Sequence, residues 1–144
     1  MMATPYTPSA LALRIEPHAI AAEREARAAF EHFQACAVRR AWVTRAIDSG
    51  DFGAAVLALT FAEQWSARAA DCAAAARAAS READAAARGL DVYRCPDASE
   101  TLLRAGNAAR VARSSADCAA SAVWEARREA IEWGALLASP EAPR

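Results

Sequence analysis

Apolar residues recur at alternating steps of three and four along three long stretches of this chain, and most of these positions hold alanine. Between residues 55 and 90 the series is Ala55, Ala58, Ala62, Trp65, Ala69, Cys72, Ala76, Ala79, Ala83, Ala86 and Leu90. Similar series cover residues 102–137 and 19–47, and Arg40 is the only break in the latter. This spacing places the apolar residues on one face of a helix that packs against other helices. The chain is therefore predicted to form three long helices packed through alanine.

Turn signals predict the ends of these helices. Ser49-Gly50-Asp51 separates a first helix over about 17–48 from a second over about 52–88, because glycine closes helices and aspartate caps them. Gly89 is predicted to close the second helix. Asp97, with Glu100 three residues later, forms a capping-box pattern for a third helix that ends near residue 138.

Short connections force neighbouring helices to run antiparallel. The predicted fold class is all-α, an antiparallel up-down-up bundle of three long Ala-rich helices. Residues 1–16 are predicted to pack on this bundle and can form a short N-terminal fourth helix that starts at Thr7-Pro8. The bundle itself is expected to span 17–138, and 139–144 to form a disordered tail.

Charge and hydropathy exclude several classes of function. The net charge is −1, all 17 basic residues are arginine, and no basic face of the kind that binds nucleic acid is visible. The apolar runs fall far short of the roughly 20 residues that cross a bilayer. The N-terminal stretch lacks the pattern of a secretory signal, so we expect a cytoplasmic protein. Four scattered cysteines do not make a disulfide scaffold.

His32 and Cys36 share one helix face and are candidate metal ligands, with Cys72 and Cys118 as further candidates. Cys36 lies 14 residues before Gly50 and Cys72 lies 22 after it. That mismatch separates them by about 12 Å along the bundle, too far for one metal ion. Cys72 and Cys118 both lie in Ala-Asp-Cys-Ala-Ala segments at roughly matching heights, so a disulfide between them is one possibility. Because the cytoplasm is reducing, we expect free thiols instead. No metal and no cofactor is predicted.

Catalytic residues are equally hard to find. No Glu-x-x-His pair, glycine-rich phosphate loop or cysteine–histidine pair beside a cleft is recognisable. The chain is therefore predicted not to be an enzyme.

Large side chains gather toward one end of the predicted bundle. Folding the helices about Gly50 brings aromatic residues of all three helices to that end, and leaves alanine, serine and cysteine at the other. The predicted bundle is thick and aromatic at the Gly50 end and slim at the other. Since the slim end buries little apolar area, a partner chain or very close packing has to compensate.

The function predicted from these features is protein–protein association, as a structural component, adaptor or immunity-type binder of phage or plasmid origin, through a protein partner or self-association. The candidate partner-binding residues are Trp42, Trp124 and Arg40. Both tryptophans fall one position off their apolar series, so they belong either to a broad core or to a partner surface. Arg40 is either a solvated rim residue or a contact to an anion or carboxylate. The alternative function is a bundle that binds a small ligand or metal between its helices.

Overall fold

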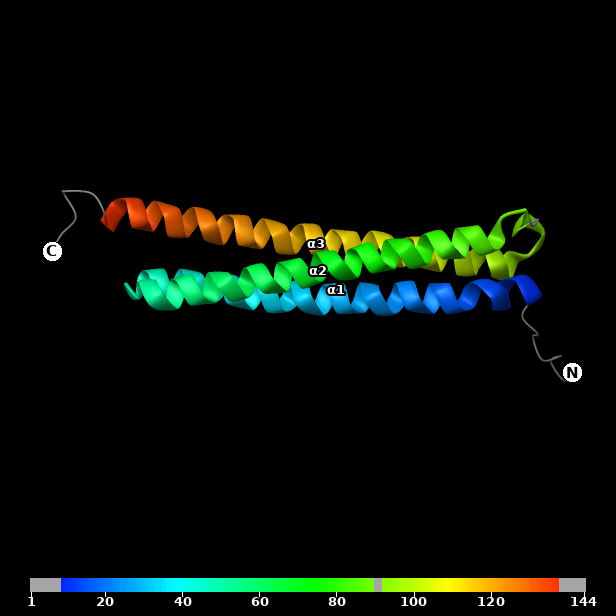
Figure 1. The fold of residues 1–144 in the computed structure, drawn as a ribbon, viewed down its shortest axis with the longest axis horizontal. Coiled ribbons are helices and arrows are strands. Elements are labelled where there is room, and N and C mark those ends of the chain that lie inside the picture. Colours follow the sequence, from blue (N-terminus) through cyan, green and yellow to red (C-terminus); the bar gives the residue numbers. More distant parts are fainter. Residues whose placement is uncertain (1–8, 90–91, 138–144) are drawn as a thin grey trace, which may run out of the picture.

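Three long helices form a narrow rod. The computed structural model describes residues 9–89 and 92–137. Helix α1 (Ala10–Asp48) is followed by α2 (Phe52–Ala87), a single 3-10 turn η1 (Val92–Arg94), and α3 (Pro96–Leu137). The three helices lie side by side, with α1 and α3 running in one direction and α2 in the other (Figure 1). The predicted all-α, up-down-up bundle is confirmed.

Helix α1 begins earlier than predicted and runs through a proline. Ser9 is its N-cap, and the Ser9 hydroxyl accepts a hydrogen bond from the backbone N–H of Ala12. Residues 10–16 therefore belong to α1 and do not form the separate fourth helix that the sequence allowed, and its predicted start at Thr7-Pro8 lies outside the described residues. The series of buried residues continues upstream of Pro17 through Ile15 and Ala12. Because residues before and after Pro17 pack on the other helices, α1 continues through the proline. Pro17 itself lies on the exposed face, where water can hydrate the carbonyl group that loses its hydrogen bond.

The turns follow the predicted glycines. Gly50 and Gly89 have φ of 73° and 76°, in the left-handed region that glycine adopts without steric cost. The Asp51 carboxylate accepts from the backbone N–H of Ala54 at 2.9 Å, so the predicted cap of the second helix is confirmed.

The predicted cap of the third helix is wrong. Helix α3 starts at Pro96, which suits the first helical position, so Asp97 already lies inside the helix. The Asp97 carboxylate accepts from the backbone N–H and the hydroxyl of Ser9, at 2.7 and 2.9 Å, and also from the backbone N–H of Ala98 at 2.9 Å. Asp97 therefore joins the beginnings of α1 and α3.

Alanine forms most of the interior. In α2 the buried residues include Ala55, Ala58, Ala62, Ala69, Ala76, Ala79 and Ala83, as the repeat predicts. In α3 the buried face is rotated from the predicted one: Thr101, Ala108, Ser115 and Ala122 are buried, whereas Ala109 and Ala116 are half-buried. Helix α3 packs more extensively on α1 than on α2, and this asymmetry explains the rotation.

Helices α1 and α3 keep one register along their length. The contacts Ser9–Asp97, Cys36–Ala119 and Thr44–Glu129 join residues separated by 88, 83 and 85 positions. Because this difference in residue number changes little, α1 and α3 run parallel and keep nearly the same axial alignment along the bundle. These contacts lie near the start, middle and end of α1.

The Gly50 end is aromatic, but its large side chains are not a closed core. The exposed ones are Trp42, Phe52, Val56, Leu57, Phe61, Trp124 and Ile131. Ile15, Val43 and Cys36 are the largest fully buried side chains. Alanine contacts hold helix axes near the short end of the usual range of about 8–10 Å, so bulky side chains beside the seam turn outward. Large side chains do gather at the Gly50 end as predicted, but most of them are exposed rather than buried between the helices.

Candidate protein-binding surfaces

The exposed apolar residues at the Gly50 end form the first candidate site. We call Trp42, Phe52, Val56, Leu57, Phe61, Trp124 and Ile131 the Gly50-end surface. Trp42 is 52% exposed and Trp124 is 62% exposed. Of the two interpretations of these tryptophans, a broad core does not fit such exposure. Both lie where a partner can reach them.

Trp42 is held by a neighbouring arginine. The Arg39 guanidinium lies 4.8 Å from the centre of the Trp42 ring and 5.3 Å from that of Phe61. Arg39 thus bridges α1 and α2 by stacking on one aromatic ring from each helix. Cation–π contacts of this kind are worth about 0.5–1 kcal/mol at exposed sites, so Arg39 favours the present orientation of the two rings.

Trp124 has a similar arrangement on α3. The Arg128 guanidinium lies 5.2 Å from the Trp124 ring centre. One turn further along α3, the Nε of Arg127 donates to the Glu63 carboxylate of α2 at 2.8 Å. Since Phe61 and Glu63 are two residues apart, Trp42 and Trp124 lie near the same turn of α2, toward its two sides.

Arg40 contacts carboxylates within the chain. Its Nη2 lies 2.8 Å from Glu125 Oε2 and 3.5 Å from Glu129 Oε1, both on α3. The hydroxyl of Thr44 donates to the other Glu129 oxygen at 2.8 Å. The Arg40 side chain is 38% exposed, while its Nε is buried and lacks a hydrogen-bond partner among the described residues. Arg40 therefore combines the two predicted roles, as a rim residue that binds carboxylates.

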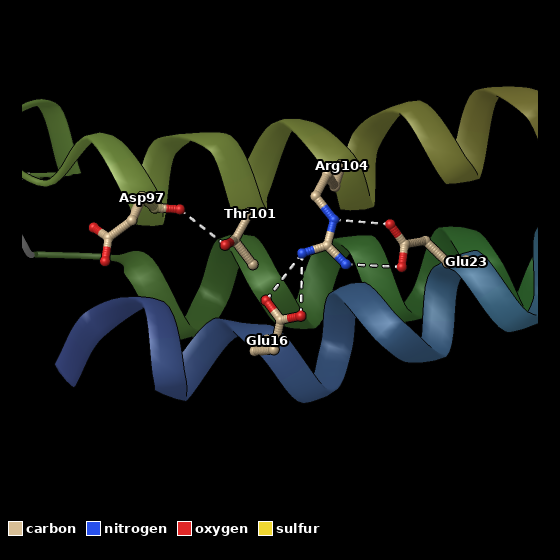
Figure 2. Close-up of polar contacts among 5 residues, drawn as sticks. All are labelled: Glu16, Glu23, Asp97, Thr101 and Arg104. Atoms are coloured by element: carbon tan, nitrogen blue, oxygen red, sulfur yellow. Dashed lines mark hydrogen bonds and ion pairs between the residues drawn. The ribbon is translucent and has the colours of Figure 1, made fainter. Parts of the chain in front are cut away.

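A second arginine joins α3 to α1 near the other end. Figure 2 shows Arg104 between two carboxylates: it donates to both Glu23 oxygens at 2.9 Å and to both Glu16 oxygens at 3.1 Å. Hydrogen bonding to Arg104 lowers the pKa of the Glu23 carboxyl, and both carboxylates raise the pKa of Arg104. Glu23 and Arg27 are four residues apart on α1, but the Glu23 carboxylate accepts hydrogen bonds from Arg104 of α3. Periodicity alone does not give the register between helices that would reveal this contact.

Arg104→Met is expected to lower the free energy of unfolding by about 1 kcal/mol at pH 7, because these half-exposed charges are partly screened by water. The depressed pKa of Glu23 contributes stability above the unfolded-state pKa, and this contribution disappears as the pH falls through the folded-state value. The difference in free energy of unfolding between wild type and Arg104→Met, measured by urea unfolding, should therefore be smaller at pH 3 than at pH 7.

Arg24→Met is the matched control for Arg104→Met. Among the described residues, Arg24 pairs with its neighbour Glu25 alone, and its side chain is 76% exposed. We expect almost no effect at either pH. An Arg104→Met effect that is the same at pH 7 and pH 3 would contradict the role assigned to Glu23.

The cysteines and histidines have ordinary structural contacts. All four cysteines are free thiols, and burial raises the pKa of the Cys36 thiol, which donates to the Ala119 carbonyl at 3.5 Å. The His32 ring packs on Trp65 with 5.3 Å between ring centres. Within residues 9–89 and 92–137, no group of three or more His, Cys, Asp and Glu side chains is placed to hold a metal ion.

Comparisons of the chain with protein-family models, with curated proteins and with solved structures find no match. None of the described helices is apolar over a length sufficient to cross a membrane.

Proposed function

We propose that this protein acts by non-catalytic protein–protein association, as an adaptor, immunity-type binder or structural component. The observation that carries the proposal is the Gly50-end surface, where two tryptophans are more than half exposed while alanine fills the interior. Exposed large apolar side chains that are concentrated at one end of a protein are typical of interaction sites. Tryptophan is also enriched among the residues that dominate binding energy.

The arginines around these tryptophans support the same function. Arg39 and Arg128 favour the present orientations of the Trp42 and Trp124 rings before binding. Pre-ordered side chains lose less conformational entropy when a partner covers them. The surface therefore combines apolar area with restricted motion, which suits a binding anchor.

A site for a small ligand inside the bundle finds less support. Such a site needs large or polar side chains around a cavity, whereas the interior described above is mostly alanine. The two buried polar residues among those described, Thr101 and Ser115, donate to the carbonyls of Asp97 and Val111 in their own helix. Neither hydroxyl proton is therefore free to donate a hydrogen bond to a ligand.

The proposal places the protein in the cytoplasm, where thiols such as the exposed Cys118 stay reduced. Its partner is either a second copy of the chain or another protein of the same cell.

Trp42→Ala and Trp124→Ala are each expected to weaken association by about tenfold or more, because each removes an exposed aromatic anchor. Light scattering at micromolar concentration measures self-association, and affinity capture from the source cells followed by titration measures binding to a partner. Leu103→Ala is the matched control, because Leu103 is similarly exposed, at 61%, but lies near the opposite end of the bundle.

Circular dichroism should show that all three variants remain folded. A protein that is monomeric and captures no partner would contradict the proposal. Folded tryptophan variants that associate like wild type would contradict the assignment of the surface.

A further inference from the structure

A groove between α2 and α3 has basic walls and an apolar floor. Its volume is about 610 Å³. The walls are Arg77 and Arg81 of α2 and Arg110 and Arg113 of α3, and we call this site the arginine groove. The floor consists of alanines, namely Ala70, Ala73, Ala74, Ala78, Ala109 and Ala116.

The small floor residues explain why the groove is hollow. An alanine side chain ends at Cβ, so it does not fill the furrow between two helices whose axes lie about 8–10 Å apart. Arg77 and Arg81 are four residues apart on one helix, and Arg110 and Arg113 are three apart on the other, so each pair follows one wall.

The groove carries more positive charge than the chain neutralises. Asp117 is the one acidic residue in its lining, and its carboxylate lies 3.7 Å from the Nε of Arg113. Arg110 donates to the side-chain oxygen of Asn107, which is uncharged. Within the described part of the chain, Arg77 and Arg81 make no hydrogen bond or ion pair. Four arginines thus line the groove with a single carboxylate among them.

We propose that the arginine groove binds an acidic amphipathic helix of a partner protein, which adds a fourth helix to the bundle. This inference rests on the proposed association function and names the chemistry of the partner. A narrow face of small or aliphatic residues packs on the alanine floor, as in helix-in-groove recognition. Aspartate and glutamate on both flanks of the partner helix meet the two arginine walls, because guanidinium groups bind carboxylates in bidentate pairs.

The same charges disfavour a second copy of this chain at the groove. A two-fold axis through the groove would bring its arginines against their own equivalents, and like charges facing one another disfavour association. Nucleic acid would use the arginine walls, but its phosphates gain nothing from an alanine floor. The combination of apolar floor and basic walls therefore fits an acidic helix best.

The test uses three probes on the full chain. The first is a labelled helical peptide of about three heptads with alanine and leucine at a and d and glutamate at e and g. The second is the same peptide with lysine in place of glutamate, and the third is a labelled RNA duplex of mixed sequence. Fluorescence anisotropy at two salt concentrations measures the affinity of each probe.

Two variants test the walls and the floor separately. Arg77→Ala with Arg81→Ala removes one wall, and Ala74→Trp fills an exposed part of the floor without changing charge. We expect each to weaken binding of the glutamate peptide by about tenfold or more. Arg14→Ala with Arg27→Ala changes the net charge equally at exposed positions of α1 and should change binding less than about twofold.

The inference is supported if only the glutamate peptide binds and if both groove variants weaken it. It is overturned if the glutamate peptide does not bind, or if the α1 control loses as much affinity as the Arg77→Ala, Arg81→Ala variant. It is also overturned if the RNA duplex binds more tightly than the peptide and depends on Arg77 and Arg81 in the same way. A native complex that requires Trp42 or Trp124 but tolerates the groove variants would leave the association function intact and reject the groove as its site.

Discussion

Ile15→Ala is expected to lower the free energy of unfolding by about 2–4 kcal/mol, the largest effect that we predict for a single substitution. Ile15 is fully buried in a core whose other members are mostly alanine. Removing its side chain leaves a cavity that the surrounding methyl groups cannot fill, because alanine has no alternative rotamer with which to repack. Urea unfolding followed by circular dichroism measures the change.

Ile20→Ala is the matched control for Ile15→Ala. Both residues lie in the same part of α1, on either side of Pro17, but Ile20 is 54% exposed whereas Ile15 is 0% exposed. We expect less than about 1 kcal/mol for Ile20→Ala, since little apolar area is lost from the interior. Equal effects at the two positions would show that residues 10–16 do not pack on the bundle as described.

Ala76→Leu and Ala112→Leu are each expected to destabilise the protein by about 1–3 kcal/mol through overpacking. Both alanines are fully buried in the same core cluster, where three helix backbones lie close together. A leucine there either leaves its preferred rotamer or pushes the helices apart, which loosens the neighbouring alanine contacts. Thermal and urea unfolding both report this change.

Exposed alanines provide the controls for these enlargements. Ala75→Leu and Ala120→Leu introduce the same side chain into the same two helices at exposed positions. Leucine and alanine have similar helix propensities, so these variants should be within about 0.5 kcal/mol of wild type. If the buried variants are as stable as these controls, the alanine interior is loose, and a missing partner helix becomes the better explanation of the repeat.

Much of the fold could be predicted because alanine phasing and glycine turns are local signals. The three-four series of α2 matches its buried residues, and Gly50 and Gly89 end helices as expected. Pro17 misled the prediction because a proline usually interrupts a helix, and its tolerance here depends on burial of Ile15 against the other helices. The rotation of the buried face of α3 could not be predicted, because it depends on how extensively α3 packs on α1 and on α2. The apolar repeat does not contain that information.

The candidate sites also differ in how far the sequence alone predicts them. Trp42 and Trp124 stood out because they lie one position off an apolar series, and that offset corresponds to their exposure. The Arg104 cluster and the arginine groove did not stand out, because each depends on residues from two helices at matching heights. Only the relative positions of the helices along the bundle bring these side chains together.

The parallel register of α1 and α3 has a consequence for the order in which the chain folds. Contacts between α1 and α2 close around the short turn at Gly50, whereas contacts between α1 and α3 join residues 81 to 88 positions apart. Closing longer loops costs more chain entropy and slows contact formation. The α1–α2 hairpin, closed by residues 49–51, and the α2–α3 hairpin, closed by residues 88–95, are therefore expected to form before the contacts between α1 and α3. Because the arginine groove needs α2 and α3 side by side, it exists only once the α2–α3 hairpin has formed, and an acidic helix bound there would slow the separation of these two helices.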